Sequence, residues 1–224
     1  MIAGEWTKQT IYLYLINCFH QQSKDATSSI LLIDDDSGKG IYQIKNLCEQ
    51  LGIKASFAII PSMVDSQDID SLIYWQKNGY GISLHGYNHK DWRELKYEEI
   101  ANDIKLCEMW LKSKGFISKD VRIIVTPHGS NNAAVRKAIK DKGYQMVAGA
   151  NILNPDTKVF QLGRIMITKY TDLNEIYSLM KKAKEKNLFM ILGTHSSMPE
   201  EFSLEKTKAV LQMAIDMKFE FLNK

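Results

Sequence analysis

Short apolar segments alternate with longer amphipathic segments along most of this chain. The apolar segments at residues 30–33, 55–60 and 80–84 are rich in large or β-branched side chains and are followed by polar residues, as buried strands often are. Between residues 97 and 114 the apolar residues instead recur at helical spacing, and Gly115 follows as a stop signal. Such an alternation of strands and helices is typical of a parallel sheet covered by helices.

The same pattern continues to the end of the chain. It predicts seven or eight strand and helix units, a number that favours a β/α barrel. The other expected helices are a stretch that ends near residue 52 and residues 66–79, 132–142, 173–186 and 204–217. The other expected strands are residues 121–126, 145–148, 164–168, 188–192 and 219–222, with a loop at residues 149–163.

The composition is that of an ordinary globular chain. Its 224 residues, 45% apolar and 25% charged, are enough for one well-buried core, and we expect one domain over residues 30–224. The net charge of +3 and the scattered lysines give no sign of a nucleic-acid partner. Cys18, Cys48 and Cys107 share no short spacing, so we expect free thiols rather than a disulfide framework.

Residues 10–19 are apolar enough to suggest the core of a secretory signal. However, Glu5 replaces the basic flank expected there, Asn17 interrupts the apolar run, and no small-residue cleavage site follows. The run is also too short to span a bilayer. We therefore expect residues 1–29 to be an N-terminal extension, helical and packed on the barrel, and we expect no transmembrane span.

Three successive carboxylates, Asp34, Asp35 and Asp36, follow the apolar segment at residues 30–33. Adjacent carboxylates repel one another and cost free energy to desolvate unless a cation or a donor compensates them. A metal ion is the obvious compensation. In the alternative interpretation, Asp36 and Ser37 cap the helix that follows and the other two are solvated turn residues.

Four of the five histidines also lie just after predicted strands. They are His85, His89, His128 and His195, and His20 is the exception. Because the carboxyl ends of parallel strands meet at one rim of a barrel, we expect these imidazoles to share that rim with the carboxylates. Two histidines at i and i+4 suit a divalent metal, although many such pairs are structural or merely exposed.

At these positions the chain resembles the polysaccharide deacetylases, metal-dependent carbohydrate esterases. Residues 32–36 are similar to the family's first motif, Thr-Phe-Asp-Asp-Gly, and residues 85–89 match its paired histidines apart from Gly86. Residues 125–129 match its Arg-Pro-Pro-Tyr-Gly motif in part, and the strand leading to His195 is similar to its last motif. The resemblance implies an α/β fold, a distorted β/α barrel of seven or eight parallel strands with outer helices.

The resemblance also implies a hydrolase that removes acetyl groups from an N-acetylated or O-acetylated polysaccharide or oligosaccharide. In such a hydrolase, Asp35, His85 and His89 would hold a divalent metal, most simply Zn²⁺, with Co²⁺ or Ni²⁺ as alternatives. Asp34 would be the general base and His195 the general acid. One carboxylate and two imidazoles leave positions open for water and a substrate carbonyl, as catalytic rather than structural sites do.

Further residues are expected beside the substrate. The backbone N–H of His128, which follows Pro127, would help to hold the tetrahedral oxyanion. Tyr87 and Trp92 are candidates for stacking on sugar rings, with local packing as the alternative. Family members commonly act outside the cytoplasm, so the resemblance implies an extracytoplasmic or cell-surface location.

Two departures from the family pattern affect this assignment. Val125 stands where the family has an arginine that pairs with the catalytic base, and Arg164 is the candidate replacement. The family's acid that orients the catalytic histidine is not evident, and Asp172 and Glu175 are the nearest acids.

The backbone at the acidic cluster raises a separate question. Neighbouring residues of a strand point to opposite faces, so Asp34 and Asp35 can both reach one site only where the strand is irregular. We therefore predict irregular backbone at residues 34–36.

Two other functions stay open on the sequence alone. The chain could hydrolyse another amide or acyl group with the same metal, or it could bind a sugar without turnover. Val125, which replaces the family's arginine, is the reason to consider a protein without turnover. A hydrolase of this type requires metal, whereas a non-catalytic sugar-binding protein need not retain it. The sequence gives no indication of oligomeric state.

Overall fold

The strands of the protein form a parallel barrel. The computed structural model describes residues 28–149 and 152–222, and the structural statements below refer to these. The strand order is β2-β3-β4-β5-β6-β7-β1-β8, and a further pairing of β1 with β2 closes a barrel of seven parallel strands. The predicted distorted β/α barrel is therefore confirmed. The strands are β1 (Ser29–Asp35), β2 (Ser56–Ile59), β3 (Gly81–Leu84), β4 (Ile123–Val125), β5 (Gln145–Gly149), β6 (Gln161–Met166), β7 (Met190–Thr194) and β8 (Glu220–Leu222).

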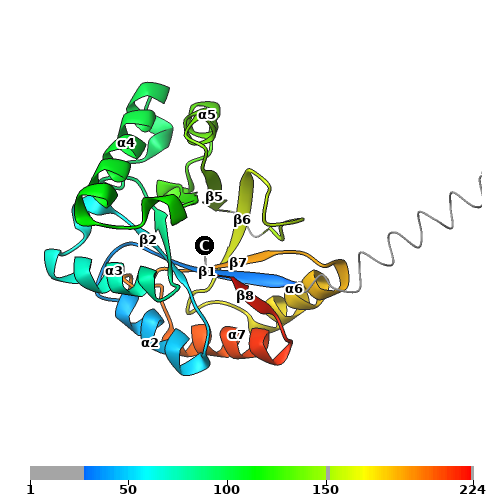
Figure 1. The fold of residues 1–224 in the computed structure, drawn as a ribbon. Helices are drawn as coiled ribbons and strands as arrows, with labels where there is room; N and C mark the ends of the chain where they lie inside the picture. The colour runs from blue at the N-terminus through cyan, green and yellow to red at the C-terminus, as the bar shows by residue number, and fades with distance from the viewer. Residues whose placement is uncertain (1–27, 150–151, 223–224) are drawn as a thin grey trace, which may run out of the picture.

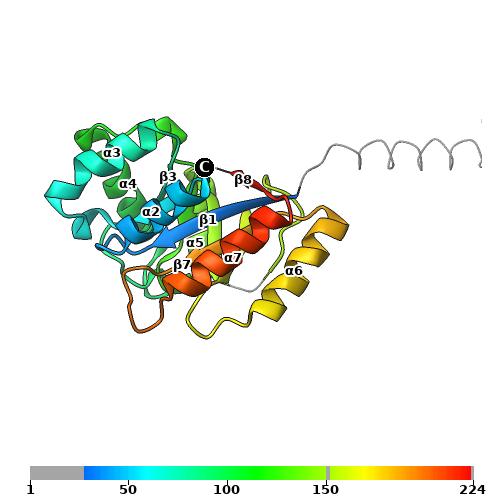
Figure 2. The ribbon, with the colours of Figure 1, turned by 90° about the horizontal axis from the view of Figure 1, so that it is seen from below.

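The helices lie around the outside of the strands (Figure 1). Helices α4 and α5 pack against each other, and α7 packs against both α6 and α2. The view from below shows α2 and α7 running alongside β1 (Figure 2). The helices are α2 (Ile41–Leu51), α3 (Ile69–Lys77), α4 (Tyr97–Lys114), α5 (Ala133–Asp141), α6 (Leu173–Lys186) and α7 (Leu204–Asp216).

The distortion of the barrel arises at β1, which has three neighbours. Along one edge it pairs with β7. Along the other edge, its first residues pair with β8 and its last residues, Ile33 to Asp35, pair with β2. The barrel is therefore closed at the carboxyl end of β1, where the acidic cluster lies.

Alternate residues of each strand face two different apolar clusters. Leu31 and Ile33 belong to the smaller cluster, which contains residues of the strands and none of the helices and so fills the barrel interior. Ile30 and Leu32 belong to the larger cluster, which includes the buried faces of the helices. This alternation, with a period of two residues, decides which acidic side chains can reach the interior rim of the barrel.

The predicted elements agree closely with the structure in most of the chain. Helices α4 and α6 have the expected bounds, and the strands differ by a few residues at their ends. The largest difference is β6, which begins at Gln161 inside the segment expected to be a loop. The expected helix within residues 1–29 lies almost wholly outside the described residues. Among the described helices, none has the length and apolar character that crossing a membrane requires.

Candidate metal centre and active site

The three acidic residues at the end of β1 point to three different places. Asp35 continues the interior-facing set of Leu31 and Ile33, whereas Asp34 faces the helices with Ile30 and Leu32. The strand is regular up to Asp35, but Asp36 has φ 62°, in the left-handed region. This turn brings the carboxylate of Asp36 back toward the interior rim. Irregular backbone was predicted at residues 34–36 so that Asp34 and Asp35 could reach one site, but it occurs at Asp36 only, and Asp34 and Asp35 continue the strand.

Asp36 lies beside the two histidines that follow β3. Its Oδ1 atom is 3.4 Å from Nε2 of His85 and 3.5 Å from Nε2 of His89, and the two Nε2 atoms are 3.1 Å apart. Ligands held by one tetrahedral zinc ion at about 2.0–2.1 Å are themselves about 3.4 Å apart. Oδ1 of Asp36 is buried without a hydrogen-bond partner among the described residues. The three donor atoms therefore fit a divalent metal.

The surroundings of His85 prepare its Nε2 atom for such a role. Its Nδ1 atom lies 2.8 Å from the backbone oxygen of Val125, a hydrogen bond in which Nδ1 must be the donor. The Nε2 lone pair is then free to bind a metal, as is usual for histidine ligands. His89 reaches the same point because its backbone is left-handed, with φ 57°. Burial, followed by the neighbouring His85, lowers the pKa of His89, which keeps that imidazole neutral.

Asp35 forms the centre of a second group with Arg164 and His195. Its Oδ2 atom accepts a hydrogen bond from Nη1 of Arg164 and lies 3.3 Å from Nε2 of His195. Asp35 is fully buried and Arg164 is 5% exposed. Burial raises the pKa of Asp35, but Arg164, His85 and His195 outweigh it and hold that pKa well below its usual range.

Arg164 lies on β6 and extends past β7 to reach Asp35 on β1. Its side chain has room to do so because residue 193 of β7 is a glycine. A Cβ atom at Gly193 would lie 2.5 Å from the sulfur of Met166 and 3.2 Å from Cδ of Arg164. A side chain at position 193 would therefore compete with the arginine for space.

The contact between Asp35 and His195 shifts the pKa of His195 upward, whereas it shifts that of Asp35 downward. Burial lowers the pKa of His195, but the hydrogen bond and charge of Asp35 outweigh this effect, so that its pKa is raised. On the other side of the ring, Nδ1 lies 3.7 Å from a carboxylate oxygen of Glu201. The imidazole thus lies between two acids and can carry a proton at neutral pH.

Asp34 does not reach this site. It is 1% exposed, and its carboxylate accepts hydrogen bonds from the hydroxyls of Thr194 and Ser196 and from the backbone N–H of Ser196. Burial raises its pKa to about 7, although these hydrogen bonds act in the opposite direction. The expected assignment of Asp34 as base and Asp35 as metal ligand therefore does not match the geometry, because the pleat turns Asp34 away. Oδ2 of Asp35 is 3.9 Å from His85, and Asp36 occupies the place expected for Asp35.

The two groups open into one cavity of about 260 Å³. Its lining includes Asp36, His85, His89, Arg164 and His195, with His128, Gly129, Met198 and Glu201 at the sides. His128, which follows Pro127, is exposed and has a left-handed backbone. Its ring lies against that of His89, with centroids 4.4 Å apart. The imidazole of His128 thus forms part of the wall.

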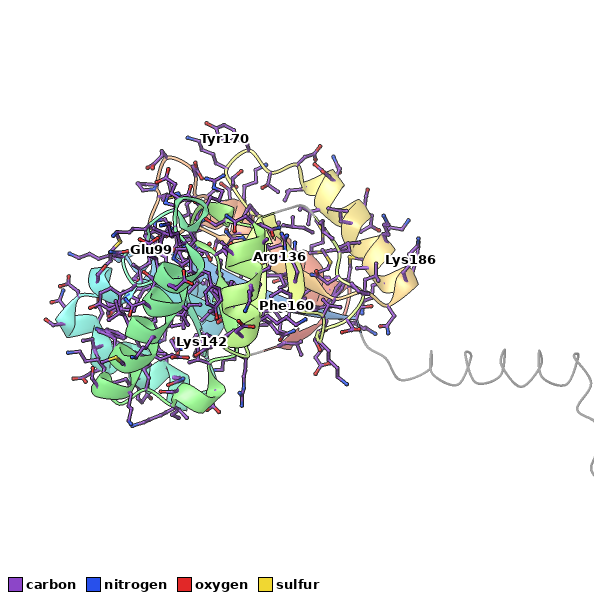
Figure 3. All side chains as sticks on the ribbon, turned by 90° about the horizontal axis from the view of Figure 1, so that it is seen from above. Glu99, Arg136, Lys142, Phe160, Tyr170 and Lys186 are labelled. Atoms are coloured by element: carbon purple, nitrogen blue, oxygen red, sulfur yellow. The ribbon has the colours of Figure 1, made fainter. Side chains whose placement is uncertain are left out.

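The aromatic residues expected to stack on sugar lie elsewhere. Trp92 is fully buried in the outer core, so its ring is not available to a substrate, and this expectation is wrong. Tyr87 is half-buried and packs against the same core. Tyr170, on the loop that follows β6, is 78% exposed and projects from the edge of the molecule (Figure 3). It was not singled out from the sequence, because an isolated tyrosine in a loop carries no pattern.

Comparison with known protein families identifies the family of the chain. A family model described as polysaccharide deacetylase matches residues 21–147, more than half of the chain. The chain belongs to the polysaccharide deacetylase family. This is a family of hydrolases that act on amide or ester bonds, as the sequence resemblance implied. No curated protein sequence matches the chain.

Solved structures of polysaccharide deacetylases have the same fold. A family 4 acetyl xylan esterase from Clostridium thermocellum, in complex with a cobalt ion, has 14% identity and a TM-score of 0.63, with 87% of each chain covered. A polysaccharide deacetylase from Bacillus cereus has 16% identity and a TM-score of 0.63, covering 88% of this chain and 92% of its own. A pseudoenzyme of the same family from Bacillus anthracis has 15% identity and a TM-score of 0.57, covering 88% and 64%.

Two acids that line this cavity were not expected there from the sequence. Asp36 is the third carboxylate of the cluster and matches a glycine in the alignment of residues 32–36 with the family motif. A rule based on the strand period alone places Asp34 and Asp36 on one face, and only the left-handed backbone at Asp36 reverses this. Glu201 lies in a loop after β7 and approaches His195 only through the fold.

Proposed function

We propose that this protein is a metal-dependent deacetylase acting on an N-acetylated or O-acetylated polysaccharide or oligosaccharide. The observation that carries the proposal is the convergence of Asp36, His85 and His89 on one point of a cavity that His195 also lines, with the buried Asp35 directly behind His195. The cobalt complex of the Clostridium thermocellum esterase supports a divalent metal in this fold. Zn²⁺ is the simplest occupant, and Co²⁺ or Ni²⁺ are alternatives.

In this proposal Asp36, His85 and His89 hold the metal. When bound, a divalent ion supplies Lewis acidity, which polarises an acyl carbonyl and lowers the pKa of water. The Val125 carbonyl keeps Nε2 of His85 in its unprotonated form. Burial raises the pKa of Asp36, but the neighbouring His85 outweighs it and holds that pKa below its ordinary value, which favours the ionised carboxylate.

Asp35 is the proposed general base. Its Oδ1 atom is buried and has no hydrogen-bond partner among the described residues, whereas Oδ2 is bound by Arg164. Oδ1 can therefore accept the proton of an attacking water. Arg164 balances the charge of the carboxylate, as the arginine replaced by Val125 is expected to do in the family.

His195 is the proposed general acid. An amide nitrogen is a poor leaving group unless it is protonated as the bond breaks, and an imidazole with a raised pKa can supply that proton. His128 lines the cavity and is the proposed contact for the oxyanion, and the exposed Tyr170, on the loop after β6, is a proposed contact for the sugar. Pro127 is buried beneath His128, so it is not a proposed contact.

The decisive experiment measures acetate release from acetylated chito-oligosaccharides and acetylated xylan in the presence of Zn²⁺, Co²⁺ or Ni²⁺. Asp35→Asn should reduce the rate by about 10² to 10⁴-fold, as expected for loss of a general base. Asp68→Asn is the matched control, because Asp68 is also a buried acid, bound to Tyr42 away from the cavity. Equal activity of Asp35→Asn and the wild type would contradict the assignment.

A sugar-binding protein without turnover is the second candidate, favoured by the pseudoenzyme with this fold from Bacillus anthracis. Stoichiometric metal together with acetate release excludes it. Binding of the same oligosaccharides without acetate release, in a protein that takes up no metal, would favour it. Metal-dependent hydrolysis of other amides or esters, with no activity on acetylated sugars, would instead favour a different acyl substrate.

A further inference from the structure

Asp34 is a buried acid that the proposed chemistry does not use. It lies on the helix-facing side of β1, next to Ile30 and Leu32, where an apolar side chain would avoid the cost of desolvating a carboxylate. All of its hydrogen bonds named above come from two residues, Thr194 and Ser196. The positions of these two partners in the chain suggest a role for Asp34.

Thr194 and Ser196 are the residues immediately before and after His195. The Thr194 hydroxyl donates to Oδ1 of Asp34 at 2.6 Å, and the backbone N–H of Ser196 donates to the same atom at 3.0 Å. The Ser196 hydroxyl donates to Oδ2 at 2.5 Å. One carboxylate thus binds the chain on both sides of the proposed acid.

A second connection holds the same loop against the end of β1. The hydroxyl of Ser197 donates to the backbone oxygen of Asp36 at 2.6 Å and accepts from the backbone N–H of Gly38 at 3.0 Å. Together with the pairing of Asp34 with Thr194 in the parallel ladder, these bonds fix the loop after β7 relative to the acidic cluster. His195 alone among residues 194–197 turns its side chain into the cavity.

We propose that Asp34 is a positioning residue for His195, binding Thr194 and Ser196 so that the imidazole is held against Asp35 in the cavity. The inference rests on the proposed function only in the role given to His195. Hydrogen bonds to a carboxylate are shorter and stronger than those between neutral groups, so three of them restrain the loop well. Such restraint matters because a misplacement of about 1 Å at a reacting group can cost about 100-fold in rate.

The first test measures the position of His195 without relying on activity. In the full chain with labelled histidine, the ring of His195 is titrated by NMR, and His195→Gln identifies its signals. Thr194→Val combined with Ser196→Ala removes two of the three donors with little change in volume. Thr207→Val is the matched control, because Thr207 is a fully buried threonine of α7 whose hydroxyl donates to the backbone oxygen of Ser203, away from His195.

If Asp34 positions the ring, the double variant should lose the upward shift that Asp35 gives to the pKa of His195, and the control should keep it. An unchanged titration of His195 in the double variant would overturn the proposal. This result does not depend on whether the protein hydrolyses acetylated sugars.

The second test separates positioning from general damage. An N-acetyl sugar needs protonation of its leaving group, whereas 4-nitrophenyl acetate does not. Asp34→Ala and the double variant should therefore lose at least about ten times more activity on the amide than on the aryl ester, with the loss in kcat rather than KM. Asp34→Asn should recover part of it, because an amide oxygen still accepts from Thr194 and Ser196. Equal losses on both substrates would overturn the proposal.

Discussion

Asp34, Asp35 and Asp36 carry the same functional group and have three different environments. Asp34 is held by hydroxyls and a backbone N–H, Asp35 by a guanidinium, and Asp36 by two imidazoles. The pleat of β1 separates the first two, and the left-handed backbone of Asp36 redirects the third. Adjacent acids can be tolerated here because each has a different source of compensation.

The pair of Asp35 and Arg164 leads to a prediction about stability. Arg164→Met leaves a buried carboxylate without its cation, which should lower the free energy of unfolding by about 3–5 kcal/mol. Urea denaturation of the full chain measures this. Adding Asp35→Asn to Arg164→Met should restore much of the loss, because the uncompensated charge is then removed. A double variant that is less stable than Arg164→Met would contradict this explanation.

The raised pKa of His195 leads to a prediction about pH. A general acid must be protonated, so the activity on an N-acetyl sugar should fall as pH rises through the pKa of His195. Because the net effect of Asp35 is upward, this alkaline limb should lie above the ordinary histidine value of about 6.5. The pH profile of kcat measures it. A limb at or below that value would show that Asp35 does not support the proton on His195.

The sequence was enough to predict which types of residue form the site, but not which of the three adjacent carboxylates takes which place. His85, His89 and His195 were found because histidines after successive strands meet at one rim. Arg164 was found as a replacement cation, although it pairs with Asp35 rather than Asp34. The carboxylates were assigned one position too early because the motif alignment does not contain the backbone turn at Asp36.

At the scale of elements, the site depends on how closely the start of α2 approaches the loop after β7. A Cβ atom at Gly40 would lie 2.1 Å from the backbone oxygen of Ser196. The backbone of Gly40, with φ −58° and ψ −30°, suits any residue, so crowding alone requires the glycine. Because Ser196 follows His195 directly, this contact bears on the proposed role of His195.

Gly40→Ala should therefore destabilise the protein by about 1–3 kcal/mol, as overpacked positions do, and should also reduce activity by moving the loop that carries His195. Gly149→Ala is the control, since a Cβ atom there meets nothing within 4 Å. Denaturation and acetate release are measured on both. Full activity of Gly40→Ala would show that the loop can move without displacing the acid.

The elements themselves were predictable where a helical period and a stop signal coincide. α4 ends at Gly115 and α6 at Asn187, both left-handed, and both helices have the expected bounds. The start of β6 was not predicted, because Gln161 is polar and exposed and is placed in the strand only by its pairing with Met146. Pairing between residues distant in the sequence cannot be inferred from the local pattern of apolar and polar residues.

At the scale of the whole molecule, the proposed metal joins the ends of β1 and β3, which are distant in sequence. Occupation of this point should stabilise the folded state by mass action, by about 2.7 kcal/mol when free metal is 100 times its dissociation constant. Thermal unfolding with and without Zn²⁺ measures the effect. Asp36→Asn should remove most of the shift, whereas Asp68→Asn should keep it. An equal shift in Asp36→Asn would place the ion elsewhere.

The filled interior of the barrel has a consequence for how a polymer meets this protein. Side chains such as Leu31, Ile33 and Val147 occupy the barrel axis, so among the described residues no tunnel leads through the barrel from the cavity. Under the proposed function, a sugar chain would lie across the mouth of the cavity and would not need to be threaded from an end. Acetate released there would then leave through the same opening by which the next acetyl group arrives.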